Sequence, residues 1–188
     1  MKSRMDQDIE KVLVTEEEIR QRVQELGEQL YQRFQGKDPV FVSVLRGSFI
    51  FMADLVRACP VKSDVEFIGV SSYGTGVRSS DGRVRITADL QQDISGRHVI
   101  VVEDILDSGN TLSYLKDYLL AKGAADITIV TLLDKPQRRQ KPIQADYVGF
   151  VIPDEFVLGY GLDYDQKYRN LPYIGVMKKE NGEESEQV

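Results

Sequence analysis

The chain has 188 residues, of which 41% are hydrophobic and 29% charged, and it carries a formal net charge of −6 at pH 7. This length is enough for one well-packed α/β domain, and two full domains would be unusually small. The acidic balance argues against a general nucleic-acid binder, because such proteins neutralise phosphates with basic side chains.

Targeting signals and cysteine content narrow the class of protein further. No apolar run approaches the roughly 20 residues that span a bilayer, and residues 1–6 lack the apolar core of a signal peptide. We therefore expect a cytoplasmic protein without a membrane partner. Cys59 is the only cysteine, which excludes an intrachain disulfide and a cysteine metal cluster, and we expect it to be a small buried hydrophobic residue.

The first predicted unit is a helix, a strand and a second helix. Thr15 and Glu18 have the spacing of a capping box, and apolar residues then recur at helical intervals to a helix end near residue 36. Residues 39–45 predict a buried strand, and residues 49–56 predict a helix with almost no polar face. The turn between them places backbone donors beside the Arg46 cation, so it is either a plain turn or an anion-binding loop.

A long polar segment separates the next two predicted strands. Residues 65–73 and 84–86 alternate partly between apolar and polar side chains, whereas residues 74–83 are rich in glycine, serine and charge. Such a segment is either a flexible hairpin or a functional lid, and the residues alone leave both readings open.

The densest set of polar groups follows the next buried strand. An apolar Val-Ile-Val-Val run ends in Glu103 and Asp104, and Asp107 precedes a Ser-Gly-Asn-Thr turn and a helix predicted over 111–121. Gly109 allows a tight turn, and N–H groups at the start of a helix can face a phosphate. A ligand carrying phosphate, ribose and bound metal would satisfy the whole stretch. Asp107 can instead cap the following helix.

A further strand, predicted over 127–133, completes a parallel βαβ unit. Lys135 follows this strand directly, at the sheet edge where open α/β folds bind ligands. The alternative is a solvated basic loop, and we expect the three other cations of this loop to be surface charges: Arg138, Arg139 and Lys141. His98, at the far end of its strand, is expected to be structural.

The last part of the chain predicts two strands and a loop between them. Residues 146–152 predict one strand and residues 174–177 a final short one. Between them, Phe156 lies in a loop bounded by proline and glycine, which by itself indicates a small satellite core. Residues 178–188 are polar and acidic and are expected to be frayed.

Residues 101–112, V-V-E-D-I-L-D-S-G-N-T-L, resemble the phosphoribosyl-pyrophosphate motif of type I phosphoribosyltransferases, and closely match the hypoxanthine-guanine branch. The resemblance covers about residues 40–178 in four separated matches whose order agrees. It implies an α/β fold with a mostly parallel twisted sheet flanked by helices. It also implies a single domain over residues 1–178 with a mobile lid near 72–84, a purine-binding hood near 153–172, and a disordered tail over 179–188.

The resemblance implies a site for the phosphoribosyl donor. The backbone around Leu45, Arg46 and Gly47 would hold pyrophosphate. In the family this loop often contains a non-proline cis peptide, which here would fall at Leu45-Arg46, and the sequence leaves open whether this bond is cis. The lid would begin at the Ser72-Tyr73 pair. Glu103 and Asp104 would bind the ribose hydroxyls and Mg²⁺. The 5′-phosphate would be bound by the turn that follows: Ser108, Gly109, Asn110 and Thr111.

The resemblance also implies a site for the acceptor base. Asp107 would be the general base, and Lys135 would contact the exocyclic oxygen of a 6-oxopurine. The Phe156 ring would stack on the base, and the backbone of Val157 would read its edge. The resemblance places two further residues on the pyrophosphate side. Asp163 would be a metal ligand together with Glu103 and Asp104, and Arg169 would contact pyrophosphate.

The implied reaction transfers a 5-phosphoribosyl group from phosphoribosyl pyrophosphate to hypoxanthine or guanine, giving the nucleotide and pyrophosphate. One alternative is an RNA-binding regulator on the same fold, which the acidic balance disfavours. Another is a signalling receiver that holds Mg²⁺ beside a phosphorylated aspartate, although the glycine turn and the 156–169 segment would then have no role. The apolar helix after Ser48 suggests a homo-oligomer, a dimer or a tetramer, although the core of a monomer could equally absorb this helix.

Overall fold

A six-stranded sheet forms the centre of the molecule. The computed structural model describes residues 4–72 and 84–178. The strands of this sheet, in chain order, are β2 (Val40–Leu45), β3 (Asp64–Ser72), β4 (Val84–Ala88), β5 (His98–Leu106), β6 (Asp126–Asp134) and β7 (Tyr147–Val151). Their spatial order is β4-β3-β2-β5-β6-β7, and all neighbours are parallel except β4, which is antiparallel to β3. The fold implied by the resemblance is confirmed.

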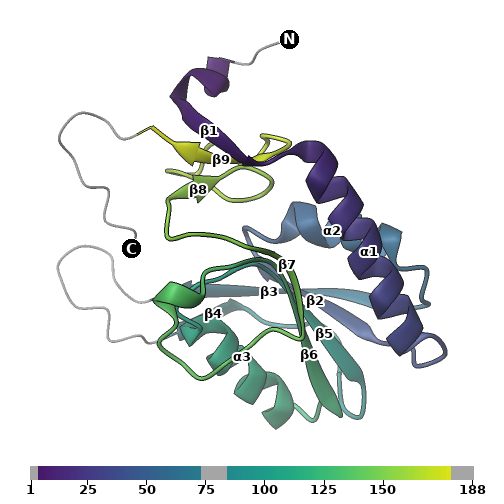
Figure 1. The fold of residues 1–188 in the computed structure, drawn as a ribbon. Coiled ribbons are helices and arrows are strands. Elements are labelled where there is room, and N and C mark those ends of the chain that lie inside the picture. The colour runs from purple at the N-terminus through teal and green to yellow at the C-terminus, as the bar shows by residue number, and fades with distance from the viewer. Residues whose placement is uncertain (1–3, 73–83, 179–188) are drawn as a thin grey trace.

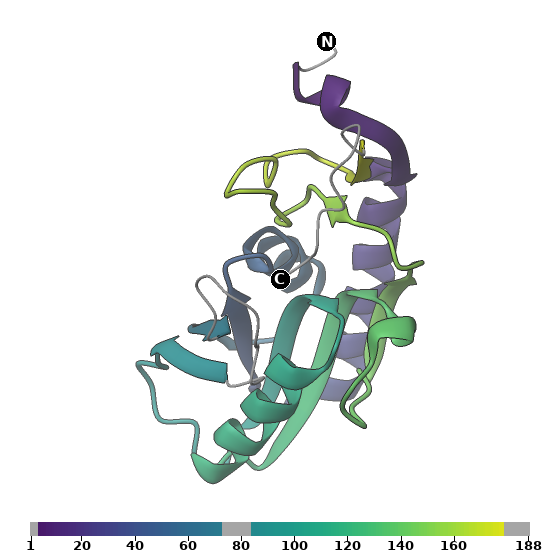
Figure 2. The ribbon, with the colours of Figure 1, turned by 90° about the vertical axis from the view of Figure 1, so that its left-hand side faces the viewer.

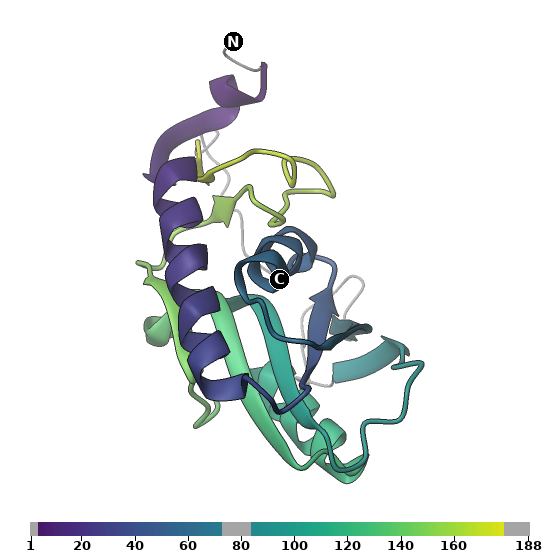
Figure 3. The ribbon, with the colours of Figure 1, turned by 90° about the vertical axis from the view of Figure 1, so that its right-hand side faces the viewer.

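Helices cover both faces of the sheet (Figures 1, 2 and 3). The helices α1 (Glu16–Phe34) and α2 (Phe49–Ala58) pack on one face, and α3 (Asn110–Ala121) packs on the other. Each face has its own apolar core because the central strands are buried on both sides. Helix α1 begins with the predicted capping box, in which Thr15 Oγ1 accepts from Glu18 N.

The two helices on the first face approach closely at one glycine. A Cβ at Gly27 of α1 would lie 2.4 Å from the carbonyl oxygen of Ala58, at the end of α2. This contact fixes where α2 sits, and α2 begins directly after the turn that contains Arg46 and Gly47. The position of that turn is therefore set by helix packing as well as by strand β2.

A second, smaller sheet carries the predicted hood segment over 153–172, and this sheet and segment together are called the hood below (Figure 1). It contains β1 (Ile9–Val14), β8 (Val157–Leu158) and β9 (Ile174–Met177), in the order β1-β9-β8. Strand β1 is a feature that the sequence pattern did not predict. Only its two end residues, Ile9 and Val14, are buried, so the alternation expected of a half-buried strand is missing.

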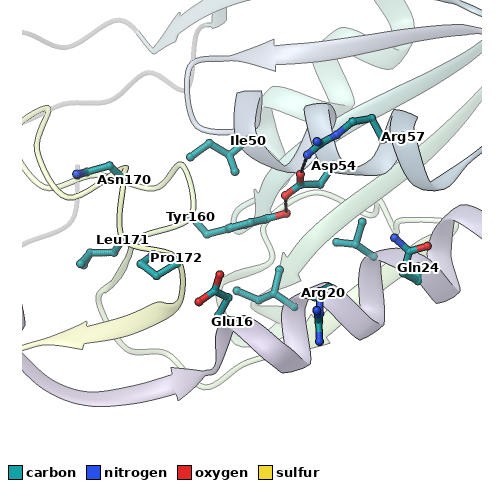
Figure 4. A pocket seen from close by; sticks show the side chains of 12 residues that line it. Glu16, Arg20, Gln24, Ile50, Asp54, Arg57, Tyr160, Asn170, Leu171 and Pro172 are labelled. Carbon is teal, nitrogen blue, oxygen red and sulfur yellow. Dashed lines mark hydrogen bonds and ion pairs between the residues drawn. The ribbon is translucent and has the colours of Figure 1, made fainter. Parts of the chain in front are cut away.

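The hood is joined to the first face of the main sheet across a cavity of about 550 Å³ (Figure 4). The cavity lies between α1, α2 and residues 160–172. At this cavity Tyr160 Oη donates to Asp54 Oδ2 of α2 at 2.5 Å. Tyr160 is 6% exposed, so this hydrogen bond is a largely buried link between the hood and the core.

Two boundaries differ from the prediction. Strand β5 does not end at Glu103 but continues to Leu106, because Glu103 and Ile105 pair with Thr131 and Leu133 of β6. The two acids are therefore held on a strand rather than in a loop. Helix α3 begins at Asn110. The predicted lid from Tyr73 onward and the predicted tail over 179–188 lie outside the described residues, and Ser72 ends β3.

Candidate active site

The carboxyl ends of β2 and β5 meet at a cavity of about 270 Å³. Parallel strands place their carboxyl ends at one edge, which is where open α/β sheets bind ligands. Nine of the predicted site residues line this cavity: Leu45, Arg46, Gly47, Glu103, Asp104, Asp107, Ser108, Gly109 and Thr111. The first strand-helix turn and the motif at residues 101–112 are thus brought together, although about 55 residues separate them in the chain.

The turn after β2 has the geometry that the resemblance implied. The Leu45-Arg46 peptide is cis, which answers the question that the sequence left open. A Cβ at Gly47 would lie 1.5 Å from Asp104 Oδ2, so the Asp104 carboxylate occupies the space that any side chain at position 47 would need. Behind the turn, the buried Ser48 hydroxyl donates to Val44 O at 2.5 Å and is 2.7 Å from Ser43 Oγ. This serine pair fixes the turn. Its one sign in the sequence is Ser43, a polar residue inside an otherwise apolar strand.

The two acids of β5 are neighbours in the chain, and Glu103 is buried whereas Asp104 is half-buried. Glu103 is 7% exposed, and its Oε1 accepts from Asp104 N, while Asp104 Oδ1 accepts from Ile105 N at 2.7 Å. Burial raises the pKa of Glu103 well above its usual range, and the neighbouring Asp104 charge adds to the rise. Burial also raises the pKa of Asp104, although hydrogen bonds and the Arg169 charge oppose it. Two such carboxylates suit a cation or hydroxyl donors at the cavity.

The turn between β5 and α3 brings backbone N–H groups to the start of a helix. Gly109 adopts φ +83°, and it is the N-cap of α3 without a side-chain capping hydrogen bond. In the first turn of α3, Asn110 N–H donates to Ser108 Oγ at 3.3 Å. Backbone N–H groups at the start of a helix attract phosphates. The capping alternative for Asp107 is wrong. Asp107 Oδ1 is instead buried and has no hydrogen-bond partner among the described residues.

Lys135 is buried, so the solvated-loop alternative is wrong for it. Its side chain is 1% exposed, and its Nζ lies 4.0 Å from Asp154 Oδ1. Burial lowers the pKa of Lys135, while the charge of Asp107 raises it. The lysine and the aspartate proposed to face the purine are therefore electrostatic neighbours.

Arg139 is not the surface charge that the sequence suggested. Its side chain is 17% exposed and forms an ion pair with Asp134, the last residue of β6. Its Nε donates to Asp107 O at 3.0 Å, and its Nη1 donates to Ile143 O at 2.6 Å. Arg138 is half-exposed and pairs with Asp154, so it stays near the surface as expected. A basic residue in a polar loop carries no sequence signal that separates these two situations.

The hood brings a second set of charges close to the first turn. Arg169 pairs with Asp163 at 2.9 Å and donates to Gly161 O at 2.7 Å. A Cβ at Gly161 would lie 2.0 Å from Gly47 O, so the hood touches the turn after β2. Gln166, which sequence reasoning missed, links the two cations, because its Oε1 accepts from Arg46 at 3.0 Å and from Arg169 at 3.1 Å.

The two predicted base-binding residues of the hood lie beside its small core. Phe156 is partly buried against the apolar cluster of the hood, and its ring meets Tyr164 edge to face with centroids 5.7 Å apart. Val157 begins β8 and is buried. This packing fits the satellite-core interpretation of Phe156, and a stacking role stays a prediction.

The predicted metal ligands do not form one cluster. Among residues 4–72 and 84–178, no group of three or more histidine, cysteine or acidic side chains could hold an ion alone. Asp163 is occupied by Arg169 and by the Gln166 N–H. Glu103 and Asp104 remain at the cavity, and this pair fits Mg²⁺, which usually binds one or two carboxylates together with substrate phosphates.

Comparisons with known proteins agree with this geometry. A family model described as the phosphoribosyl transferase domain matches residues 12–165. The hypoxanthine-guanine phosphoribosyltransferase of Bacillus subtilis is 51% identical over 93% of this chain and 96% of that protein. The bifunctional protein TilS/HprT of Listeria monocytogenes is also 51% identical, but the chain spans only 27% of its length. A hypoxanthine phosphoribosyltransferase structure from Staphylococcus aureus matches with a TM-score of 0.90 and 48% identity, over 95% of this chain and 96% of that one.

Proposed function

Because the chain belongs to the phosphoribosyltransferase family, we propose that it is a purine salvage enzyme that makes nucleotides from hypoxanthine and guanine. The donor is phosphoribosyl pyrophosphate, and the products are IMP or GMP and pyrophosphate. One observation carries the proposal: a single cavity joins the turn after β2, the acids of β5 and the N-terminus of α3. These are separate partners for pyrophosphate, ribose and 5′-phosphate.

The donor is held by groups that surround the cavity. The backbone at Arg46 and Gly47 and the guanidinium of Arg169 bind the leaving pyrophosphate, whose charge must be neutralised as the bond to the anomeric carbon breaks. The carboxylates of Glu103 and Asp104 bind the ribose hydroxyls, and the 5′-phosphate lies at the turn made of Ser108, Gly109, Asn110 and Thr111. Glu103 and Asp104 would hold Mg²⁺, which would supply further charge neutralisation, and Asp163 would join them on release from its ion pair with Arg169.

The acceptor base is held between the β6 loop and the hood. Asp107 accepts the proton that the purine loses as its ring nitrogen attacks, and its buried Oδ1 has no other partner among the described residues. Lys135 donates to the exocyclic oxygen of a 6-oxopurine, whereas adenine would present an amino donor to the same group. The ring of Phe156 stacks on the base, and the backbone of Val157 contacts its edge.

The test is a product assay with purified protein, Mg²⁺, phosphoribosyl pyrophosphate and each of hypoxanthine, guanine, xanthine and adenine. We expect IMP and GMP and no AMP, and the absence of both IMP and GMP would refute the proposal. In Asp107→Asn the turnover should fall by about 10² or more, the range of lost general-base catalysis. Asp93→Asn, which changes an exposed carboxylate before β5, is the matched control and should retain wild-type turnover.

The proposal also includes a second copy of the chain as a partner, and the cytoplasm as the location of the protein. Three large apolar side chains on α2 and β3 are 40–46% exposed: Phe49, Val65 and Phe67. We propose that a second copy of the chain covers them, which sedimentation at several concentrations would test.

Among the described residues no helix is long and apolar enough to cross a membrane. We propose that the protein acts in the cytoplasm. Neither its acidic net charge nor the names of its relatives favour an RNA-binding role.

A further inference from the structure

The loop after β6 lies against the turn that precedes α3. Three successive carbonyl groups of that turn accept hydrogen bonds from this loop. The pairs are Lys135 N to Leu106 O at 2.9 Å, Arg139 Nε to Asp107 O at 3.0 Å, and Gln140 N and Lys141 N to Ser108 O at 2.9 and 3.1 Å. The backbone carbonyl groups of residues 106–108 therefore all face the loop over residues 135–141.

These contacts decide where the N–H groups of the turn point. In a trans peptide the C=O and the following N–H point in opposite directions. Among the described residues only the Leu45-Arg46 peptide is cis, so this rule holds throughout the turn. With the carbonyls of Asp107 and Ser108 facing the β6 loop, the N–H groups of Ser108 and Gly109 face away from it. Both residues line the cavity.

Arg139 is the one side chain in this set of contacts, and it reaches three segments at once. Its guanidinium pairs with Asp134 at the end of β6, donates to Ile143 O, and donates to Asp107 O. The side chains of Arg139 and Asp134 are each 17% exposed, so the pair is largely removed from solvent. Because the guanidinium is a planar and rigid donor, it fixes these groups relative to one another more firmly than a lysine can.

The side chain of Asp107 depends on this support. Its Oδ1 has no hydrogen-bond partner among the described residues, so its direction is set through its backbone. The backbone carbonyl of Asp107 is held by Arg139, and Arg139 is held by Asp134, the residue before Lys135. A continuous chain of contacts thus connects the proposed general base to the proposed purine-binding lysine.

We propose that Arg139 is a positioning residue for phosphoribosyl transfer. It sets the place of Asp107 relative to Lys135, and with the loop backbone it keeps the N–H groups of the phosphate turn directed at the cavity. Arg139 acts through Asp107 and contacts neither substrate. The inference rests on the proposed function, because the roles of Asp107 and Lys135 are taken from it.

The test compares kcat and KM of Arg139→Met and Arg139→Lys with Arg138→Met as the matched control. Arg138 is the adjacent cation of the same loop, and its partner Asp154 lies at the surface. We expect kcat of Arg139→Met to fall roughly 30- to 100-fold, the range caused by a misplacement of about 1 Å, with a smaller change in KM for the base. Arg139→Lys keeps a positive charge beside Asp134 and should fold, yet its kcat should fall about tenfold, since one ammonium cannot replace the guanidinium fork. Arg138→Met should match the wild type.

A double-variant cycle separates positioning from general stability. If Arg139 acts through Asp107, adding Arg139→Met to Asp107→Asn should lower kcat by no more than about threefold beyond Asp107→Asn alone, because a lost base no longer needs placing. Multiplicative losses, or wild-type kcat in Arg139→Lys, would overturn the inference. An inactive wild-type protein would instead overturn the proposed function, so the two failures are distinguishable.

Discussion

Replacing Gly47 with alanine should damage the donor site selectively. The new Cβ would lie 1.5 Å from Asp104 Oδ2 and 2.6 Å from its Cγ. Non-bonded carbon contacts are comfortable at about 3.5 Å, so the carboxylate would have to move by about 2 Å. That movement breaks the 2.7 Å hydrogen bond from Ile105 N to Asp104 Oδ1. The displaced Asp104 carboxylate would also lose its proposed hydrogen bond with the ribose. A hydrogen bond to a charged group contributes about 1.5–3 kcal/mol, so kcat/KM for phosphoribosyl pyrophosphate should be roughly 10- to 150-fold lower.

Steady-state kinetics with each substrate varied in turn would check this. The KM for hypoxanthine should change little, because Lys135 and Phe156 lie on other elements. Gly36→Ala is the control for an added Cβ without a clash, because nothing lies within 4 Å of that Cβ. Gly36 has φ +76°, whereas Gly47 is outside the left-handed region, so the control carries backbone strain that Gly47→Ala does not. In an Asp104→Ala background the Gly47→Ala change should cost less, because the clashing oxygen is gone. Wild-type kcat/KM for the donor in Gly47→Ala would refute the clash.

Three further predictions concern groups away from that turn. In Tyr160→Phe the buried hydrogen bond to Asp54 is lost, so the free energy of unfolding should fall by about 1–2 kcal/mol, and a denaturant double-variant cycle with Asp54→Asn should show coupling of that order. Burial lowers the pKa of Lys135, so this side chain should lose its proton at a lower pH than an ordinary lysine. Because the neutral amine is a weaker donor to the base, KM for hypoxanthine should rise with increasing pH, and Lys135→Met should abolish that rise. Burial raises the pKa of the Cys59 thiol, and the residue is 2% exposed. A disulfide reagent at pH 8 should therefore react slowly with Cys59 in the native protein and rapidly after unfolding, and equal rates would contradict this.

The sequence predicts well those parts of the fold that depend on local interactions. The start of α1 follows from Thr15 and Glu18, which are three residues apart and bond to each other. The strands β2, β5 and β6 follow from apolar runs that are buried whatever their neighbours. These elements also fix the edge of the sheet where the acids lie, so the core of the candidate site could be predicted.

Features that depend on distant partners escaped prediction. Strand β1 exists because Ile9 to Val14 pair with Met177 to Ile174, at the opposite end of the chain. Gln166 gains its importance only when the hood brings it to Arg46. Arg139 looks like its neighbour Arg138 in the sequence, and only the folded chain buries one and leaves the other near the surface.

The arrangement also explains why the site needs so much support. Glu103 is buried and Asp104 is half-buried, the pKa of each is raised by removal from water, and Asp107 Oδ1 has no hydrogen-bond partner among the described residues. Such groups cost free energy until a ligand provides partners, and they would turn away if their backbone were free to move. Pairing of β5 with β6 holds the first two in place, and the contacts from residues 135–141 hold the third. The regular strand therefore supports the proposed donor site, whereas an irregular loop anchored by Arg139 supports Asp107, the proposed general base.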